Sequence, residues 1–172
     1  MRLFVCVAAL SCAVLSALVA PSIAAEQVPS CDLFRKRFLE APRVLSLRLP
    51  SLRLNREPPD PVLKDDTWAT DGMRAKDTGE LWYTTTLHCR AGKFYDVSSD
   101  IDTPVVSFLH PTFDLIAASI YAYTGWDAEK VVRITDQVLK NRPRDMADIK
   151  PTELSSGAYA KIAYTSFAIE LD

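Results

Sequence analysis

The first 24 residues constrain this chain most, because they separate a leader from the part that must fold. Arg2 gives a short positive start, residues 3–20 are an uncharged and mainly apolar run, and Pro21 ends that run. Ser22-Ile23-Ala24 then supplies small residues at the spacing that signal peptidase reads. The sequence therefore predicts a secretory signal peptide over 1–24 and an exported protein, either periplasmic or extracellular.

Two other interpretations of the leader stay open. The apolar run of 18 residues is long enough for a marginal membrane span, although Pro21 ends it and no basic cluster follows at once. Lipidation would use Cys12, although Ala9-Leu10-Ser11 is a poor lipoprotein signal. Charges interrupt every later apolar run, so we expect no membrane span once the signal is cleaved.

The charge balance excludes one class of partner. The whole chain has 20 basic and 22 acidic residues, and removal of the leader takes away only Arg2. A nearly neutral protein lacks the basic surface of a nucleic-acid binder, so no nucleic-acid partner is expected. The remaining length suits one domain, residues 25–172, which is large enough to fold around its own core.

The cysteines add a covalent constraint. Cys6 and Cys12 leave with the signal, whereas Cys31 and Cys89 remain. Export places this pair in an oxidising compartment, where it is expected to form a disulfide. Two free thiols or a redox pair are the alternatives, although redox cysteines usually have C-x-x-C spacing.

The first half of the chain predicts one helix, extended segments and a long loop. Apolar spacing indicates a helix from Cys31 to Glu40, capped by Ser30 and stopped by Pro42. Residues 43–55 then alternate between leucines and polar residues, as a strand with a phase slip at Pro50 would. Residues 56–79 contain three prolines and many charges, which predicts a long polar loop.

The middle of the chain predicts a hairpin followed by two helices. Alternation over residues 80–90 is typical of a strand, with Leu87 and Cys89 on its buried face, and residues 91–93 turn the chain into a partner strand over 94–98. Helices are expected over 111–124 and 127–141, with Gly125 between them.

The end of the chain completes the expected fold. Residues 142–156 are expected to form a polar connection, and 158–171 one strand with a bulge near 165–166. The fold class is therefore α+β. We expect a mostly antiparallel sheet, with a helical hairpin and a short N-terminal helix packed on one face.

Catalytic chemistry is hard to find in this sequence. No nucleophile elbow, zinc motif, phosphate loop or dinucleotide motif is present. His88 and His110 are the only histidines, and adjacent strand positions keep His88 from pairing with Cys89. Asp96, Asp100 and Asp102 could offer oxygen ligands to calcium but lack the EF-hand order. We therefore assign no catalytic residue, no metal and no cofactor.

Two tryptophans are the candidate binding residues. Trp68 lies within the expected polar loop, where it could anchor a partner or fold back onto the core. Trp82 is expected on the face of its strand opposite the buried one, where its neighbours are threonines. An uncovered Trp/Thr face can bind sugar rings or a protein, unless the helical hairpin covers it.

These features favour an exported, non-enzymatic binding or accessory protein. Its partner would be a protein or a saccharide of the envelope or extracellular space. The alternative is a small exported hydrolase or metal-dependent enzyme of an unfamiliar type, which would use His88 or His110 with a nearby aspartate. A deep pocket that joins a histidine to two acids would favour the enzyme, and a flat or convex aromatic face would favour the binding protein.

Overall fold

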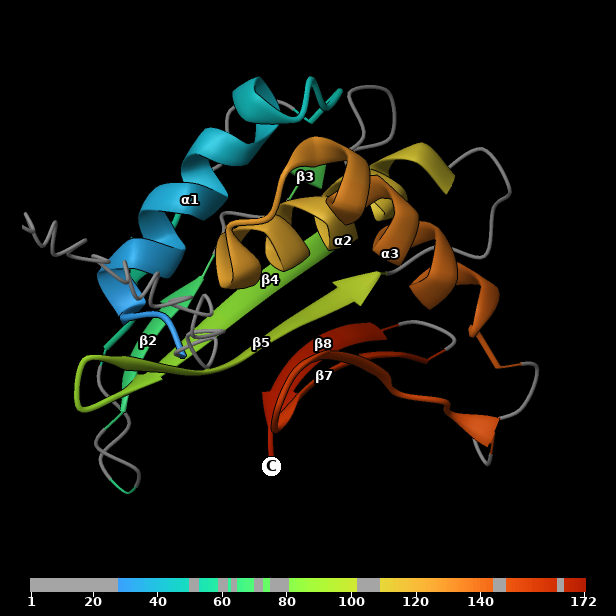
Figure 1. Ribbon diagram of the computed structural model, residues 1–172. Helices are drawn as coiled ribbons and strands as arrows, with labels where there is room; N and C mark the ends of the chain where they lie inside the picture. The colour runs from blue at the N-terminus through green and yellow to red at the C-terminus, as the bar shows by residue number, and fades with distance from the viewer. Residues whose placement is uncertain are drawn as a thin grey trace, which may run out of the picture.

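Figure 1 presents the computed structural model of this chain. The structure describes residues 28–49, 53–58, 62, 65–69, 73–74, 81–101, 109–143, 148–163 and 166–172. The expected signal peptide, residues 1–24, lies outside these ranges.

Eight strands in the described residues form one antiparallel sheet, in the order β1-β2-β4-β5-β8-β7-β6, with β3 pairing with β4. The strands are β1 Asn55–Arg56, β2 Asp66–Ala69, β3 Met73–Arg74, β4 Leu81–Arg90, β5 Lys93–Ile101, β6 Thr152–Ser155, β7 Ala158–Ile162 and β8 Ser166–Leu171. The helices are α1 Cys31–Val44, α2 Leu109–Thr124 and α3 Ala128–Lys140. The predicted α+β class with a mostly antiparallel sheet is confirmed.

The three helices lie together on one side of the sheet (Figure 1). The core fills the space between the helices and the sheet. Its largest fully buried side chains come from both of these layers: Phe34, Phe38, Leu87, Phe94, Leu115, Ile116, Ile120, Ile162, Phe167 and Ile169. Along β8, Phe167 and Ile169 are buried while their neighbours are half-buried, so one strand face points to the helices and the other points away. Among the described residues, no helix has the length and apolar character to cross a membrane.

Helix α1 begins where expected and ends later. The Ser30 hydroxyl accepts a hydrogen bond from the Leu33 N–H, as an N-cap does. The helix continues past Glu40 to Val44 with Pro42 inside it, so the expected stop at Pro42 is wrong. Pro42 forfeits one backbone donor in the last turn, and the Leu45 N–H still donates to the Ala41 carbonyl at 2.9 Å.

The strand expected over 43–55 is also wrong, because Asn55 is the only residue of the described ranges 43–49 and 53–55 that belongs to a strand. The backbone N–H groups that a strand would use have other acceptors. The Leu47 N–H donates to the Pro42 carbonyl, and the Arg48 N–H donates to the Asp114 carboxylate of α2 at 2.8 Å. The alternating leucines pack against the core from this irregular segment instead.

The segment expected as a long polar loop, 56–79, is not loop throughout. Its described residues include β2 and β3, which both pair with β4. The extra strands extend the sheet beyond the predicted hairpin on the side of β4 away from β5.

The carboxyl-terminal strand expected over 158–171 is two strands. The expected bulge near 165–166 is wrong, because the chain reverses direction between Ala163 and Ser166: the Ala163 N–H donates to the Ser166 carbonyl, and β7 pairs with β8 in antiparallel fashion. Strand β6 also lies within the expected connection 142–156. These strands bring β8 against β5 in the centre of the sheet.

The predicted β4–β5 hairpin is confirmed and is longer than expected. Its two-residue turn, Ala91-Gly92, has φ values of 51° and 75°. Two positive φ angles are the signature of a type I′ turn, whose twist matches that of the flanking strands.

The helical hairpin is confirmed. Gly125 has a φ of 68° at the end of α2, and the Asp127 carboxylate accepts a hydrogen bond from the Lys130 N–H at the start of α3.

The predicted disulfide between Cys31 and Cys89 is confirmed, with Cα atoms 5.9 Å apart. It joins the first turn of α1 to the buried face of β4. Two backbone hydrogen bonds support it, from the Cys31 N–H to the Gly92 carbonyl at 2.9 Å and from the Phe94 N–H to the Pro29 carbonyl at 3.2 Å. The start of α1 is therefore held to the β4–β5 hairpin by one covalent and two hydrogen bonds.

Candidate functional site

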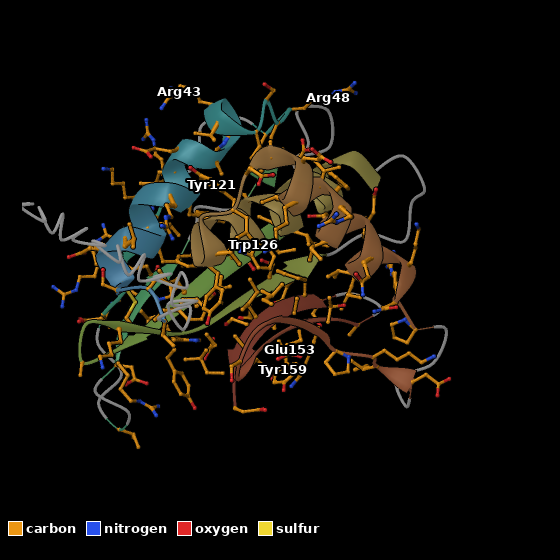
Figure 2. The ribbon with its side chains drawn as sticks, viewed as in Figure 1. Arg43, Arg48, Tyr121, Trp126, Glu153 and Tyr159 are labelled. Carbon is orange, nitrogen blue, oxygen red and sulfur yellow. A yellow bond between two sulfur atoms is a disulfide. The ribbon has the colours of Figure 1, made fainter. Side chains whose placement is uncertain are left out.

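The sheet face opposite the helices, which we call the outer face, carries a row of polar side chains from five strands. Directly paired positions run from β4 to β6 in the order His88, Asp96, Glu170, Tyr159 and Glu153. Neighbouring strands lie about 4.8 Å apart, so this outer row spans roughly 19 Å. Figure 2 shows Glu153 and Tyr159 together at the β6 end, on the sheet side of the molecule, away from Tyr121 and Trp126 of the helical layer.

Two carboxylates, Asp96 and Glu170, stand opposite each other on β5 and β8. Like charges at opposed positions destabilise an antiparallel pair. Each carboxylate has a compensating group beside it: His88 Nδ1 lies 2.7 Å from Asp96 Oδ1, and Lys161 Nζ lies 2.5 Å from Glu170 Oε2. An ionised carboxylate only accepts hydrogen bonds, so the Nδ1 atom of His88 carries the proton in this pair.

A pocket of about 260 Å³ lies on the outer face over the paired strands β5 and β8, at this pair of carboxylates. Its wall comes from both strands: Tyr95, Asp96, Ser98, Ala168, Glu170 and Leu171. The pocket therefore combines one aromatic ring, two carboxylates, one hydroxyl and two apolar side chains.

Tyr95 reaches this wall because β5 carries one extra residue opposite β4. Cys89 pairs with Phe94 and His88 pairs with Asp96, which leaves Tyr95 between them without a partner on β4. Such a bulge redirects a side chain. Phe94 stays buried in the core, whereas Tyr95 is 40% exposed.

The tyrosine is supported from the side by a cation. The Arg90 Cζ atom lies 4.0 Å from the Tyr95 ring centroid, which is within cation–π range. Arg90 in turn donates two hydrogen bonds to the buried Asp65 carboxylate, at 3.1 and 3.0 Å. Those hydrogen bonds hold the pKa of Asp65 below its ordinary value, against the opposite effect of burial. Asp65 thus holds in place the Arg90 guanidinium that packs on the Tyr95 ring.

The β6 end of the outer row is acidic. The negative charges of Asp172 and then Glu153 raise the pKa of the Tyr159 phenol above its ordinary value, and partial burial acts in the same direction. Tyr159 therefore offers a protonated hydroxyl over a wider pH range than a free tyrosine does.

The structure places Trp68, a candidate binding residue, away from this pocket. Trp68 pairs with Leu87, so it lies on the helix-facing side of the sheet. The Cζ atom of Arg35 on α1 lies 3.4 Å from its ring centroid, and that of Arg56 lies 5.9 Å away. The half-buried Trp68 ring thus lies under Arg35 at the edge of the core.

The other two residues singled out from the sequence are only partly described. The backbone of Trp82 belongs to β4 and that of His110 to α2, and both side chains lie outside the described part of the structure. The hypothesis that Trp82 binds a partner therefore stays a prediction.

The aspartates considered for calcium are not brought together. Asp96 and Asp100 are four residues apart on one strand, a separation of about 13 Å, which is too far for one ion. Asp102 lies outside the described residues. In the part of the chain that the structure describes, no three side chains of His, Cys, Asp or Glu gather closely enough to hold a metal ion.

Sequence reasoning missed Glu170, Ser98 and Tyr95 as members of one site. The polar alternation of 96–100 and of 166–170 was a usable signal for two outward faces. Their pairing was hidden, because a single strand over 158–171 gives no reason to set Glu170 opposite Asp96.

Comparison of this chain with known protein families, with curated proteins and with solved structures finds no match.

Proposed function

We propose that this chain is an exported, non-enzymatic binding or accessory protein that uses the outer face of its sheet to contact its partner. The observation that carries the proposal is the opposed pair Asp96 and Glu170 at the pocket between β5 and β8. The flanking groups His88 and Lys161 are partly exposed, so their contacts with the two carboxylates add little to stability. An arrangement that the fold does not need for stability is a good candidate for one used in recognition.

Export is supported by the leader over 1–24 and, more weakly, by the Cys31–Cys89 disulfide. The test is expression of the full chain with its own leader, followed by N-terminal sequencing of the product outside the cytoplasm. A product that begins at Ala25 or Glu26 agrees with the proposal, and a membrane-bound product that retains Met1 contradicts it.

Binding through the outer face is tested by blocking the pocket without touching its carboxylates. Ala168→Arg would place a long side chain in the pocket wall. The matched control is Val132→Arg, which adds the same side chain to an exposed position of α3 on the helical side. Both variants should melt close to the wild-type temperature.

The immobilised mature protein and both variants are then exposed to envelope extract, and each retained component is purified and rebound. A component that binds the wild type and Val132→Arg with similar affinity, but binds Ala168→Arg at least tenfold more weakly, supports the proposal. Equal binding to all three proteins contradicts it. Trp82→Ala belongs in the same series, since sequence alternation predicts that residue 82 shares the outer face.

The His88–Asp96 contact favours a second candidate, the exported hydrolase. A carboxylate that accepts a hydrogen bond from Nδ1 fixes a histidine for use of its other ring nitrogen as a general base. In that case His88→Ala should abolish turnover of a substrate bound in the pocket while the circular dichroism spectrum stays unchanged. Retained turnover in His88→Ala would contradict the candidate.

A further inference from the structure

The pocket between β5 and β8 has a charge pattern that discriminates between classes of ligand. Its two carboxylates, Asp96 and Glu170, already have partners outside the pocket in His88 and Lys161. A cationic ligand would have to share these carboxylates with His88 and Lys161. An anionic ligand would meet two carboxylates at close range and is disfavoured. A neutral ligand can bind without displacing either flanking group.

The same carboxylates retain capacity to accept hydrogen bonds. An ionised carboxylate has about four acceptor sites, so one flanking donor on each leaves several sites for a ligand. The Ser98 hydroxyl, which can donate or accept, lies in the same wall. The best complement to this wall is a group of closely spaced hydroxyl donors that carries no charge.

The remaining wall of the pocket is apolar or aromatic. The Tyr95 ring is held by Arg90, and Ala168 and Leu171 complete the lining. A pyranose ring presents both hydroxyl groups and a C–H face, which suits a wall of carboxylates beside an aromatic ring. A volume of about 260 Å³ is small among ligand sites and fits one ring better than an extended chain.

We propose that this pocket binds one ring of a neutral saccharide, with hydroxyl groups donating to Asp96 and Glu170 and the C–H face packed on Tyr95. The inference rests on the proposed function, since it names the ligand class for the outer face.

The test is a set of titrations of the ¹⁵N-labelled mature protein, followed through its amide resonances. The neutral probes are maltotriose, cellotriose and triacetylchitotriose, and the charged probes are spermidine and trigalacturonate. At least one neutral probe should cause saturable shifts of amides in 95–98 and 168–171, with a dissociation constant in the micromolar to millimolar range. The inference is overturned if no neutral probe at 50 mM shifts these amides, or if a charged probe binds there more tightly than every neutral one.

Variants tie the shifts to the wall of the pocket. Glu170→Gln removes a charged acceptor while keeping its shape, and should weaken binding of the neutral probe about tenfold. Ser98→Ala, which disturbs no charge, should also weaken it. The matched control is Glu153→Gln, since Glu153 is a carboxylate of the outer row outside the pocket wall. Equal binding by Glu170→Gln, Ser98→Ala and Glu153→Gln would overturn the proposed contacts.

The result separates this inference from the proposed function. If no saccharide binds but Ala168→Arg still abolishes capture of a purified envelope component, only the ligand class is wrong. If Ala168→Arg changes the binding of neither kind of ligand, the outer face is not the binding surface and both proposals fail. Cleavage of a bound trisaccharide would support the pocket assignment and contradict the non-enzymatic function.

Discussion

The guanidinium of Arg37 on α1 lies against the backbone of Gly125, in the turn between α2 and α3. A β-carbon added at residue 125 would come within 2.6 Å of the Arg37 Cζ atom. The same glycine has a φ of 68°, a conformation that side chains with a β-carbon disfavour. Because residue 125 has no side chain, the chain can adopt the turn between α2 and α3, and Arg37 of α1 can approach the backbone of that turn.

Gly125→Ala should destabilise the protein mainly through its backbone conformation. The left-handed conformation costs about 1–2 kcal/mol for a residue with a β-carbon, whereas the Arg37 guanidinium is the far end of a flexible side chain and can move aside at little cost. The matched control is Gly157→Ala, whose φ is 79° but whose added β-carbon would have no atom within 4 Å. Urea unfolding should therefore give similar losses for Gly125→Ala and Gly157→Ala. A clearly larger loss for Gly125→Ala would mean that Arg37 is held in place against the backbone of residue 125.

Loss of the Cys31–Cys89 disulfide should lower stability strongly. The bond joins residues 58 positions apart, and in the chain-entropy model such a link contributes up to about 4 kcal/mol. The double variant Cys31→Ala/Cys89→Ala should therefore melt on the order of 10 °C below the wild type. Mass spectrometry of the native protein without reductant should find one linked peptide pair. Two alkylatable thiols in that protein would contradict the prediction.

Asp65→Asn should weaken the protein at neutral pH and much less in acid. Because the folded-state pKa of Asp65 is depressed, its stabilising contribution is fully present above about pH 4 and is lost as the pH falls through the folded-state value. The difference in melting temperature between wild type and variant should therefore shrink between pH 7 and pH 3. Asp66→Asn is the control, since that exposed neighbour pairs with Arg56 on the surface. A difference that stays constant with pH would contradict the assignment.

The pKa of Tyr159 should fall when its acidic neighbours are neutralised. Asp172→Asn should bring this pKa closer to its ordinary value of about 10, and Glu153→Gln should do so to a smaller extent. Since the folded-state pKa is raised, the stability linked to Tyr159 is present below about pH 10 and is lost as the pH rises through the folded-state value. Absorbance at 295 nm, with Tyr159→Phe subtracted, follows the phenol directly. Glu129→Gln on α3 is the control, and a shift of equal size there would refute the assignment.

Local patterns were enough to predict part of this fold. Alternation over 80–90 assigned Cys89 to the buried face with Leu87, and two cysteines in a chain expected to be exported then predicted the disulfide. The helical hairpin could be found because Gly125 and Asp127 mark its turn by backbone chemistry that acts within a few residues.

Other parts could not be predicted, because the deciding contacts are remote in sequence. The alternating leucines of 45–49 look like a strand until the Asp114 carboxylate is seen to accept from the Arg48 N–H. The chain reverses between Ala163 and Ser166, where the sequence has no glycine or proline, so the sequence signal for the reversal is weak. The opposition of Asp96 and Glu170 depends on the register of two strands that no local rule connects.

The pairing of β5 with β8 also determines when, during folding, the outer face becomes able to bind a ligand. Strand β8 is synthesised about 70 residues after the part of β5 that it joins, so closing this contact carries one of the larger chain-entropy costs in the fold. The helical layer and the β4–β5 hairpin can assemble while only one wall of the pocket exists. A ligand that contacts both strands would bridge segments that are far apart in the sequence, and would slow their separation in the folded protein. Occupancy of the pocket would then stabilise the pairing of β5 with β8 against local opening.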